Sequence, residues 1–105
     1  MNPDAERGEI WLADLGMIGK IRPVLIMSIP YDDRERALVS YVPRTRAVRG
    51  TRHEVAHQGR GFDPGAFEVQ NISGMSPTRL IRRLGVVDGP TMARVEDALR
   101  SWLGL

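Results

Sequence analysis

The sequence predicts a mainly β domain that ends in one α-helix. Turn-forming residues such as Gly, Pro and Asp recur about every 8 to 12 residues, the spacing of a small all-β barrel or sandwich. Near the end of the chain, apolar residues change to helical spacing. The sequence contains no internal repeat, low-complexity tract or linker, so we expect its 105 residues to form a single domain.

Short apolar or alternating segments bounded by turn residues are the predicted strands. They are residues 9–15, 21–29, 37–42, 52–57, 67–72 and 79–87. The second is apolar almost throughout, which predicts a central strand buried on both faces. We expect Pro43 to close the third strand, and a turn at residues 63–65 (Asp-Pro-Gly) to precede the fifth.

The predicted helix begins at Gly89-Pro90 and ends at Gly104, since Pro favours the first helical turn and Gly the C-terminal cap. Apolar residues then recur at helical spacing, at Met92, Val95, Leu99 and Trp102. We interpret this stripe as core packing. A partner-binding helix, or a contribution to a dimer interface, is the alternative.

Composition excludes several classes of protein. The chain has no cysteine, so it forms no disulfide, thiolate nucleophile or Cys-ligated zinc site. It has no apolar run near the roughly 20 residues that cross a bilayer, and its first residues are too acidic and polar for a signal peptide. We therefore expect a cytoplasmic protein without a membrane partner.

The positive charge is uneven and consists almost entirely of arginine, with Lys20 as the one lysine. Seven arginines against Glu35 and Glu54 give residues 34–60 a formal charge of +5, whereas the rest of the chain carries −3. Arginine presents a planar fork that suits phosphate. This stretch predicts either an anionic partner or a solvated loop surface, and charge alone leaves both open.

Residues 53–57 (HEVAH) match the zinc-peptidase pattern H-E-x-x-H. That pattern binds zinc on a helix, where residues four apart share one face. Here the segment is short and lies between glycines, which predicts a strand. In a strand the two histidines lie about 13 Å apart, too far to share an ion. We therefore expect no metal site.

Three stretches in order along the chain carry a family resemblance, namely residues 7–16 (RGEIWLADLG), 19–28 (GKIRPVLIMS) and 42–45 (VPRT). They are similar, in that order, to the opening strand, the G-x-K-x-R-P strand and the V-x-P-I-T segment of the MazF/PemK family of toxin endoribonucleases. Arg79-Leu80 and the terminal helix also match in order and spacing. The resemblance spans nearly the whole chain.

This resemblance implies an SH3-like small β-barrel with a C-terminal helix, as in PemK and CcdB toxins. It also implies a homodimer whose grooves hold single-stranded RNA, and a cognate antitoxin that covers them. Cleavage in this family proceeds by attack of the RNA 2′-hydroxyl, without metal or cofactor, and leaves a 2′,3′-cyclic phosphate and a 5′-hydroxyl. That reaction needs a fixed cation on the phosphorane, a proton acceptor and a proton donor.

Carried over by position, Arg22 is the expected cation and Thr45 the residue that orients the scissile phosphate. The candidate RNA-binding residues are Lys20, Ser28, Arg44, Arg46, Arg49 and Arg52. The chain departs from the family in residues 70–75 (QNISGM), where many relatives have a carboxylate, Gln and Arg-Thr. The general base is therefore not identified, and His53 and Glu54 are the nearest titratable candidates.

Two other hypotheses remain open at this stage. The first is a non-enzymatic toxin similar to CcdB, which binds DNA gyrase, because such toxins often carry a Trp near the C-terminus and Trp102 lies there. The second is an RNA-binding or inactivated relative, which the missing loop carboxylate allows.

Overall fold

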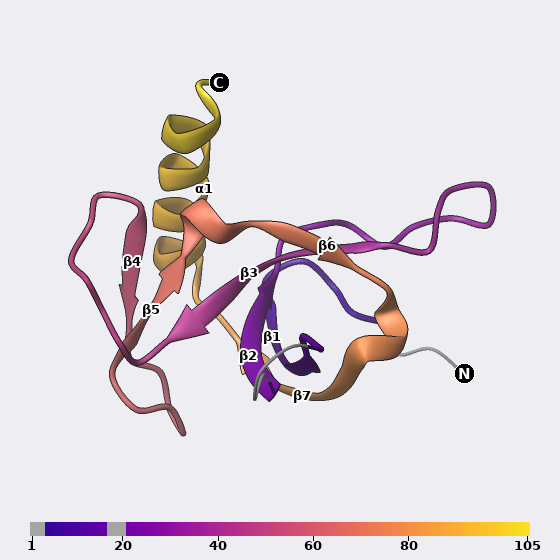
Figure 1. Cartoon of the computed structure of the whole chain (residues 1–105), viewed down its shortest axis with the longest axis horizontal. Coiled ribbons are helices and arrows are strands. Elements are labelled where there is room, and N and C mark those ends of the chain that lie inside the picture. Colours follow the sequence, from indigo (N-terminus) through magenta and orange to yellow (C-terminus); the bar gives the residue numbers. More distant parts are fainter. Residues whose placement is uncertain (1–3, 17–20) are drawn as a thin grey trace.

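The computed structural model describes residues 4–16 and 21–105 and shows an antiparallel sheet with one helix packed against it (Figure 1). The strands are β1 (Glu9–Asp14), β2 (Ile21–Ile26), β3 (Val39–Thr45), β4 (Glu54–His57), β5 (Gly65–Glu68), β6 (Ser73–Met75) and β7 (Leu80–Val86). Two short 3₁₀ turns, Val69–Asn71 and Pro77–Arg79, flank β6, and the helix α1 covers Gly89–Leu103. The predicted class, mainly β with a C-terminal helix, is confirmed.

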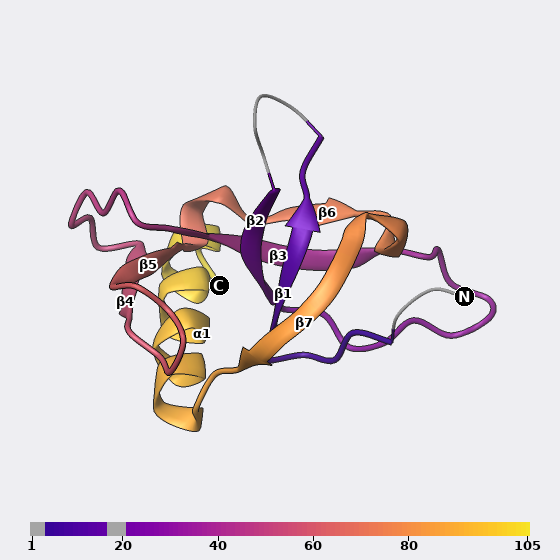
Figure 2. The same ribbon diagram turned by 90° about the horizontal axis from the view of Figure 1, so that it is seen from below.

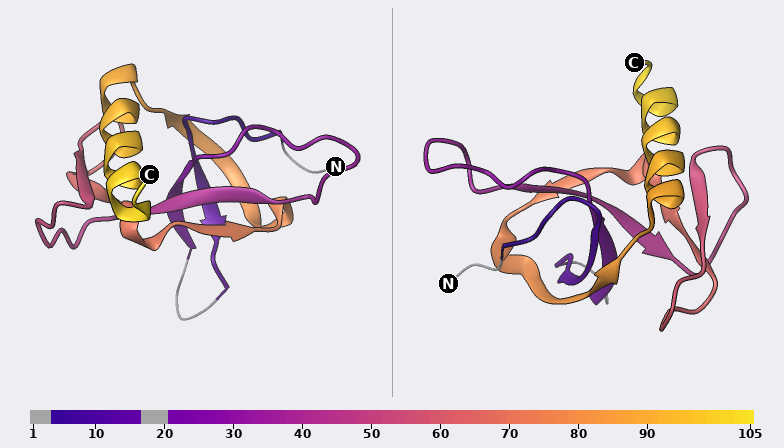
Figure 3. Two further views of the ribbon diagram at one scale, coloured as in Figure 1. Left: turned by 90° about the horizontal axis from the view of Figure 1, so that it is seen from above. Right: turned by 180° about the vertical axis from the view of Figure 1, so that it is seen from behind.

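The strands follow the order β4-β5-β3-β2-β1-β7, and β6 pairs with β3 away from this path. Within the described residues, this hydrogen-bonded path does not close on itself, although the strands curl around a core (Figure 2). The expected barrel is therefore open between its ends, β4 and β7. The helix lies beside β4 and the first 3₁₀ turn (Figure 3).

Strand β2 is the centre of the core, as predicted, with β1 and β3 as its two neighbours. Because strand side chains alternate, Val24 and Ile26 enter the cluster enclosed by the curled sheet, whereas Leu25 enters the cluster beneath α1. The predicted strand was too long, however. It ends at Ile26, and Ile29 is 74% exposed on the following loop.

The prediction that Pro43 closes the third strand was wrong, because β3 continues to Thr45. One edge of β3 pairs with β2 at residues 41–43, and the other edge changes partner. It pairs with β6 up to Tyr41 and with β5 from Arg44 onward. Pro43 lies between the two partners, where a residue without an N–H costs no ladder hydrogen bond.

The predicted strand 67–72 is not continuous. Strand β5 starts at Gly65, inside the expected turn, and ends at Glu68. A 3₁₀ turn with buried Val69 follows, and β6 then begins at Ser73. Phe67, Val69 and Ile72 all pack into the cluster beneath α1, which explains their apolar spacing. The 3₁₀ turn keeps these side chains buried although the strand is not continuous.

The helix matches its predicted limits. The Asp88 carboxylate accepts the Thr91 N–H at 2.8 Å, and Gly104 ends the helix with φ of 71°. Val95 is fully buried, and Met92 and Leu99 pack partly buried beside it. Trp102 differs from the prediction, since it is 42% exposed. No helix of the described residues is long and apolar enough to cross a membrane.

The R-G-E segment at the start of the chain has a structural role. Glu9 accepts the Glu6 N–H at 2.8 Å, the Trp11 indole N–H at 3.0 Å and the Arg83 Nε–H at 2.7 Å. Partial burial alone would raise the pKa of Glu9, but these donors together hold it below its ordinary value. Glu9 thus fixes β1 against β7.

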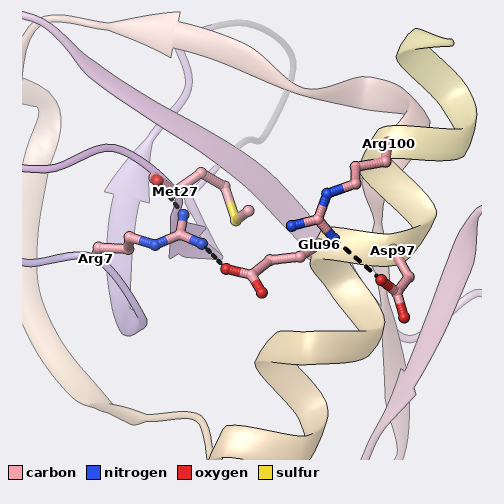
Figure 4. A network of polar contacts seen from close by, with 5 residues as sticks. All are labelled: Arg7, Met27, Glu96, Asp97 and Arg100. Carbon is pink, nitrogen blue, oxygen red and sulfur yellow. Dashed lines mark hydrogen bonds and ion pairs between the residues drawn. The ribbon is translucent and has the colours of Figure 1, made fainter. Parts of the chain in front are cut away.

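Arg7 connects the same segment to the helix (Figure 4). Its guanidinium donates to the Met27 carbonyl at 2.6 Å and to the Glu96 carboxylate. On the neighbouring turn of α1, Arg100 pairs with Asp97 at 3.1 Å. The start of the chain, the end of β2 and the helix are thereby held together.

Candidate active site

A cleft of about 930 Å³ opens beside β2, β3 and β5. Its lining includes five arginines and two carboxylates, namely Arg22, Arg44, Arg46, Arg60, Arg82, Asp63 and Glu68. Arg22 lies on β2, Arg82 on β7 and Arg44 on β3, whereas Arg46 follows β3 and Arg60 lies on the loop before β5. The excess of positive charge in a concave site attracts a polyanion.

Arg22 and Thr45 lie in this cleft together. In the antiparallel pairing, Val24 faces Pro43, so continuing the register by two residues places Arg22 across from Thr45. Arg22 Nη2 donates to the Arg44 carbonyl at 3.1 Å, which holds the guanidinium in place. Thr45 Oγ1 accepts the Ala47 N–H at 3.0 Å, which fixes the hydroxyl at the end of β3.

Glu68, at the end of β5, is the residue next to this pair that sequence reasoning missed. Its Oε2 lies 3.4 Å from Arg22 Nη2, and both side chains are little more than a quarter exposed. The sequence holds one signal for it. Glu68 stands between two buried residues, Phe67 and Val69, so alternation turns its side chain to the opposite side of the strand.

Arg44 is buried, and its donors are used inside the protein. Its Nε donates to His57 Nδ1 at 2.9 Å, and Nη2 donates to the carbonyls of His57 and Asp63. The guanidinium also lies 5.1 Å from the centre of the Phe62 ring. Arg44 therefore holds the loop between β4 and β5 as one wall of the cleft.

His57 is the neutral partner of Arg44. Burial lowers its pKa, and the adjacent Arg44 charge lowers it further, whereas Asp88 acts weakly in the opposite sense. A neutral ring leaves Nδ1 free to accept from Arg44 Nε. The ring also packs on Phe67 and Phe62, at 4.8 and 5.3 Å between centroids.

The structure separates His53 and Glu54 from Arg22. Both line a second cleft of about 340 Å³, together with Arg49 and Glu68, and Glu68 borders both clefts. His53 is buried and packs against Trp102 in a tilted arrangement, with 5.3 Å between the ring centroids. Its Nε2 lies 3.3 Å from Ser101 Oγ. Glu54 Oε1 accepts backbone N–H groups of residues 49–51 at 2.9, 2.7 and 3.3 Å, and so closes that loop.

Strand β4 covers Glu54–His57, so the predicted strand is shorter than expected and His53 lies in the turn before it. The two histidines have separate partners in Ser101 and Arg44. Among residues 4–16 and 21–105, no three His, Asp or Glu side chains gather in a way that could hold a metal ion.

The remaining RNA-binding candidates lie in different places. Arg46 lines the main cleft, is 77% exposed and lies 3.4 Å from Asp63. Ser28 is away from both clefts, where its hydroxyl accepts the Ser40 N–H at 2.9 Å. Arg52 is exposed and is not among the described residues that line either cleft. Lys20 lies outside the described residues.

Arg60 and Arg82 were not singled out as site residues from the sequence. Arg60 stands between glycines, on the loop that Arg44 holds. Arg82 reaches the cleft because β7 pairs with β1, with Leu12 and Arg82 as partners. Nothing in the local pattern around Arg82 reveals this pairing, which joins segments about seventy positions apart.

Comparison with known proteins gives one consistent result. The family model described as PemK-like, MazF-like toxin of type II toxin–antitoxin system matches residues 6–103. An endoribonuclease from a mycobacterial species, solved in complex with its cognate antitoxin, is 31% identical, with 96% of each chain covered and a TM-score of 0.83. A second mycobacterial endoribonuclease is 29% identical, with 99% of this chain and 95% of that chain covered and a TM-score of 0.82.

MazF from Deinococcus radiodurans has the same fold at 21% identity, with 99% of this chain and all of that chain covered and a TM-score of 0.83. The expected fold and family are therefore confirmed. The chain belongs to the PemK-like, MazF-like toxins of type II toxin–antitoxin systems.

Proposed function

We propose that this toxin is an endoribonuclease that cuts single-stranded RNA in the cleft around Arg22, without a metal ion or cofactor. The 2′-hydroxyl of the RNA attacks the adjacent phosphorus, and the 5′-oxygen of the next nucleotide leaves. The products are a 2′,3′-cyclic phosphate and a 5′-hydroxyl. The likeness to two named endoribonucleases, at 29% and 31% identity over nearly the whole chain, supports this activity.

The observation that carries the proposal is the pairing of Arg22 with Thr45 at the wall of a cationic cleft. Attack on phosphorus builds negative charge on the equatorial oxygens, and a cation already fixed in position stabilises that charge without reorganisation. The Arg44 carbonyl supplies the fixation. Thr45 Oγ1 already accepts an N–H, so its own hydrogen is available for a phosphate oxygen.

The other arginines of the cleft guide the strand. Arg46, Arg60 and Arg82 border the same hollow and neutralise neighbouring phosphates of a bound RNA. An antitoxin with an acidic extended segment fits the same charges and excludes RNA. The neighbour solved with its cognate antitoxin supports such a partner. Homodimerisation, implied by the family resemblance, is part of this proposal.

The proposal is tested with purified protein and single-stranded RNA in EDTA. We expect wild type to cut, and Arg22→Ala to cut at least about 100-fold more slowly, because a lost transition-state donor costs about that much. Arg34→Ala is the matched control, since Arg34 is highly exposed on the loop at the opposite end from β4 and β5 (Figure 2). Intact RNA with wild type, or equal cutting by Arg22→Ala, contradicts the proposal.

A gyrase-binding toxin is the second candidate, and the exposure of Trp102 near the C-terminus favours testing it. The discriminating measurement is inhibition of DNA supercoiling by gyrase. Inhibition that persists in Arg22→Ala, with no RNA cleavage by wild type, supports the second candidate.

A further inference from the structure

We propose that Glu68 is the general base of this toxin and takes the proton from the attacking 2′-hydroxyl. This inference rests on the proposed RNA cleavage. The family resemblance assigns no role to Glu68. In this proposal Glu68 takes the place of the carboxylate that is missing from residues 70–75, although it stands at a different position in the chain.

The described lining of the cleft contains two carboxylates, and they differ in how firmly they are held. Asp63 lies on the loop before β5, is 73% exposed and pairs with Arg46 on the rim at 3.4 Å. Glu68 lies on a strand that is paired on both edges, is 27% exposed and faces Arg22. A general base must hold its position within hydrogen-bond reach of the reacting proton, and Glu68 meets that condition better.

The contact between Glu68 and Arg22 also leaves the carboxylate available. A charge-assisted hydrogen bond is typically about 2.7–2.9 Å long, whereas Glu68 Oε2 lies 3.4 Å from Arg22 Nη2. Glu68 Oε1 forms no hydrogen bond with the residues that the structure describes. The carboxylate thus lies beside the phosphate-binding cation with acceptor capacity remaining.

The proposed cleavage step balances in protons and electrons. The 2′-O–H bond breaks and its proton passes to the Glu68 carboxylate, while the 2′-oxygen forms a bond to phosphorus. The bond from phosphorus to the 5′-oxygen breaks, and this oxygen leaves with the electron pair and takes a proton from water. Glu68 then returns its proton to solvent. Arg22, 3.4 Å away, stays protonated and offsets the charge on the phosphorane.

Glu54 is the other carboxylate near this site that could act as the general base. Glu54 and Glu68 are direct partners across the β4–β5 pair. Glu68 borders both clefts, whereas Glu54 lines only the smaller one. Glu54 Oε1 also accepts three loop N–H groups. The two glutamates on paired strands therefore have different roles. Glu54 closes a loop, and Glu68 lies beside Arg22 in the main cleft.

The test measures single-turnover cleavage by Glu68→Gln, which keeps the shape and an acceptor oxygen toward Arg22 but removes the base. We expect the single-turnover rate constant to fall about 100-fold or more, the usual contribution of a general base. Affinity for an uncleavable 2′-deoxy RNA should change less than about threefold, and the acid limb of the pH–rate profile should disappear. Glu35→Gln, on the loop of residues 27–38, is the control and should match wild type.

The outcomes separate the two proposals. If wild type does not cut RNA, the proposed function itself fails. If wild type cuts, Arg22→Ala does not, and Glu68→Gln cuts as fast as wild type with the same pH profile, the assignment of Glu68 alone is overturned. A loss in Glu54→Gln that leaves Glu68→Gln active also overturns it. Thermal unfolding of each variant shows whether lost activity reflects lost folding.

Discussion

At the scale of single residues, Arg44 shows how a charged side chain can shape a site without facing the substrate. Its guanidinium is buried among His57 Nδ1, two carbonyls and the face of Phe62. A buried charge is tolerated when its donors are satisfied, and costs several kcal/mol when its partners are lost. The loop of residues 58–64 consequently keeps its place beside Arg22.

Arg44→Ala should lower the free energy of unfolding by about 3 kcal/mol, since it leaves buried acceptors without donors. Arg46→Ala, two residues along, removes an exposed ion pair and should cost less than about 0.5 kcal/mol. Urea denaturation of both variants measures the difference. Equal losses would show that the buried network does not stabilise the fold.

The depressed pKa of His57 predicts a loss of stability in mild acid. The unfolded chain takes up this proton near pH 6.5, whereas the folded protein, with its burial and Arg44, takes it up only at lower pH. The unfolded state therefore binds more protons as the pH falls below about 6.5, and the free energy of unfolding decreases.

His57→Gln, which keeps an acceptor, should reduce the difference in unfolding free energy between pH 7 and pH 5. Chemical denaturation at the two pH values tests this expectation. The lowered pKa values of Glu9 and Asp88 act mainly below about pH 5, and both carboxylates are still present in His57→Gln, so their contribution cancels in the comparison. An unchanged difference in His57→Gln would contradict the account.

At the scale of elements, the start of β5 depends on the close approach of two strands at Gly65. A Cβ at this position would overlap the Thr45 carbonyl and lie 2.8 Å from Arg44 Nη1. Glycine is required here by contact with backbone rather than by an unusual φ. The same approach brings β5, and with it Glu68, toward the end of β3.

Gly65→Ala should lower the free energy of unfolding by about 1–3 kcal/mol, the usual cost of overpacking. It should also reduce RNA cleavage in protein that remains folded, because Thr45 has to move. Gly89→Ala is the matched control, since a Cβ there meets nothing within 4 Å. The two variants are compared by thermal unfolding and by cleavage rate, and indistinguishable behaviour would refute the role given to Gly65.

Element positions were predictable where local pattern decides them. Alternation of apolar residues and helix-capping residues predicted the limits of β1, β2 and α1 to within a few residues, because each element buries apolar side chains from its own sequence. The limits of β3, β5 and β6 were missed because β3 exchanges one partner for another midway. That exchange depends on residues far apart in the sequence, so no local signal around Pro43 reveals it.

At the scale of the whole molecule, the fold redistributes the basic stretch of residues 34–60. Its first arginines lie on the loop of residues 27–38, at the end of the molecule opposite β4 and β5 (Figures 2 and 3). Arg46 and Arg60 meet Arg22 and Arg82, which lie outside the stretch, in one cleft. Family resemblance led to Arg22 and Thr45. Alternation alone turns Glu68 away from the core, but strand pairing is what brings Glu68 and Arg82 to the cleft.

The most direct test of the central claim is the chemical identity of the RNA ends made by wild-type protein in EDTA. The account predicts a 2′,3′-cyclic phosphate upstream and a 5′-hydroxyl downstream of each cut, and no cut where a single 2′-deoxy nucleotide precedes the scissile phosphate. A 5′-phosphate product, cleavage of the deoxy-substituted strand, or activity that requires a divalent metal ion would contradict it.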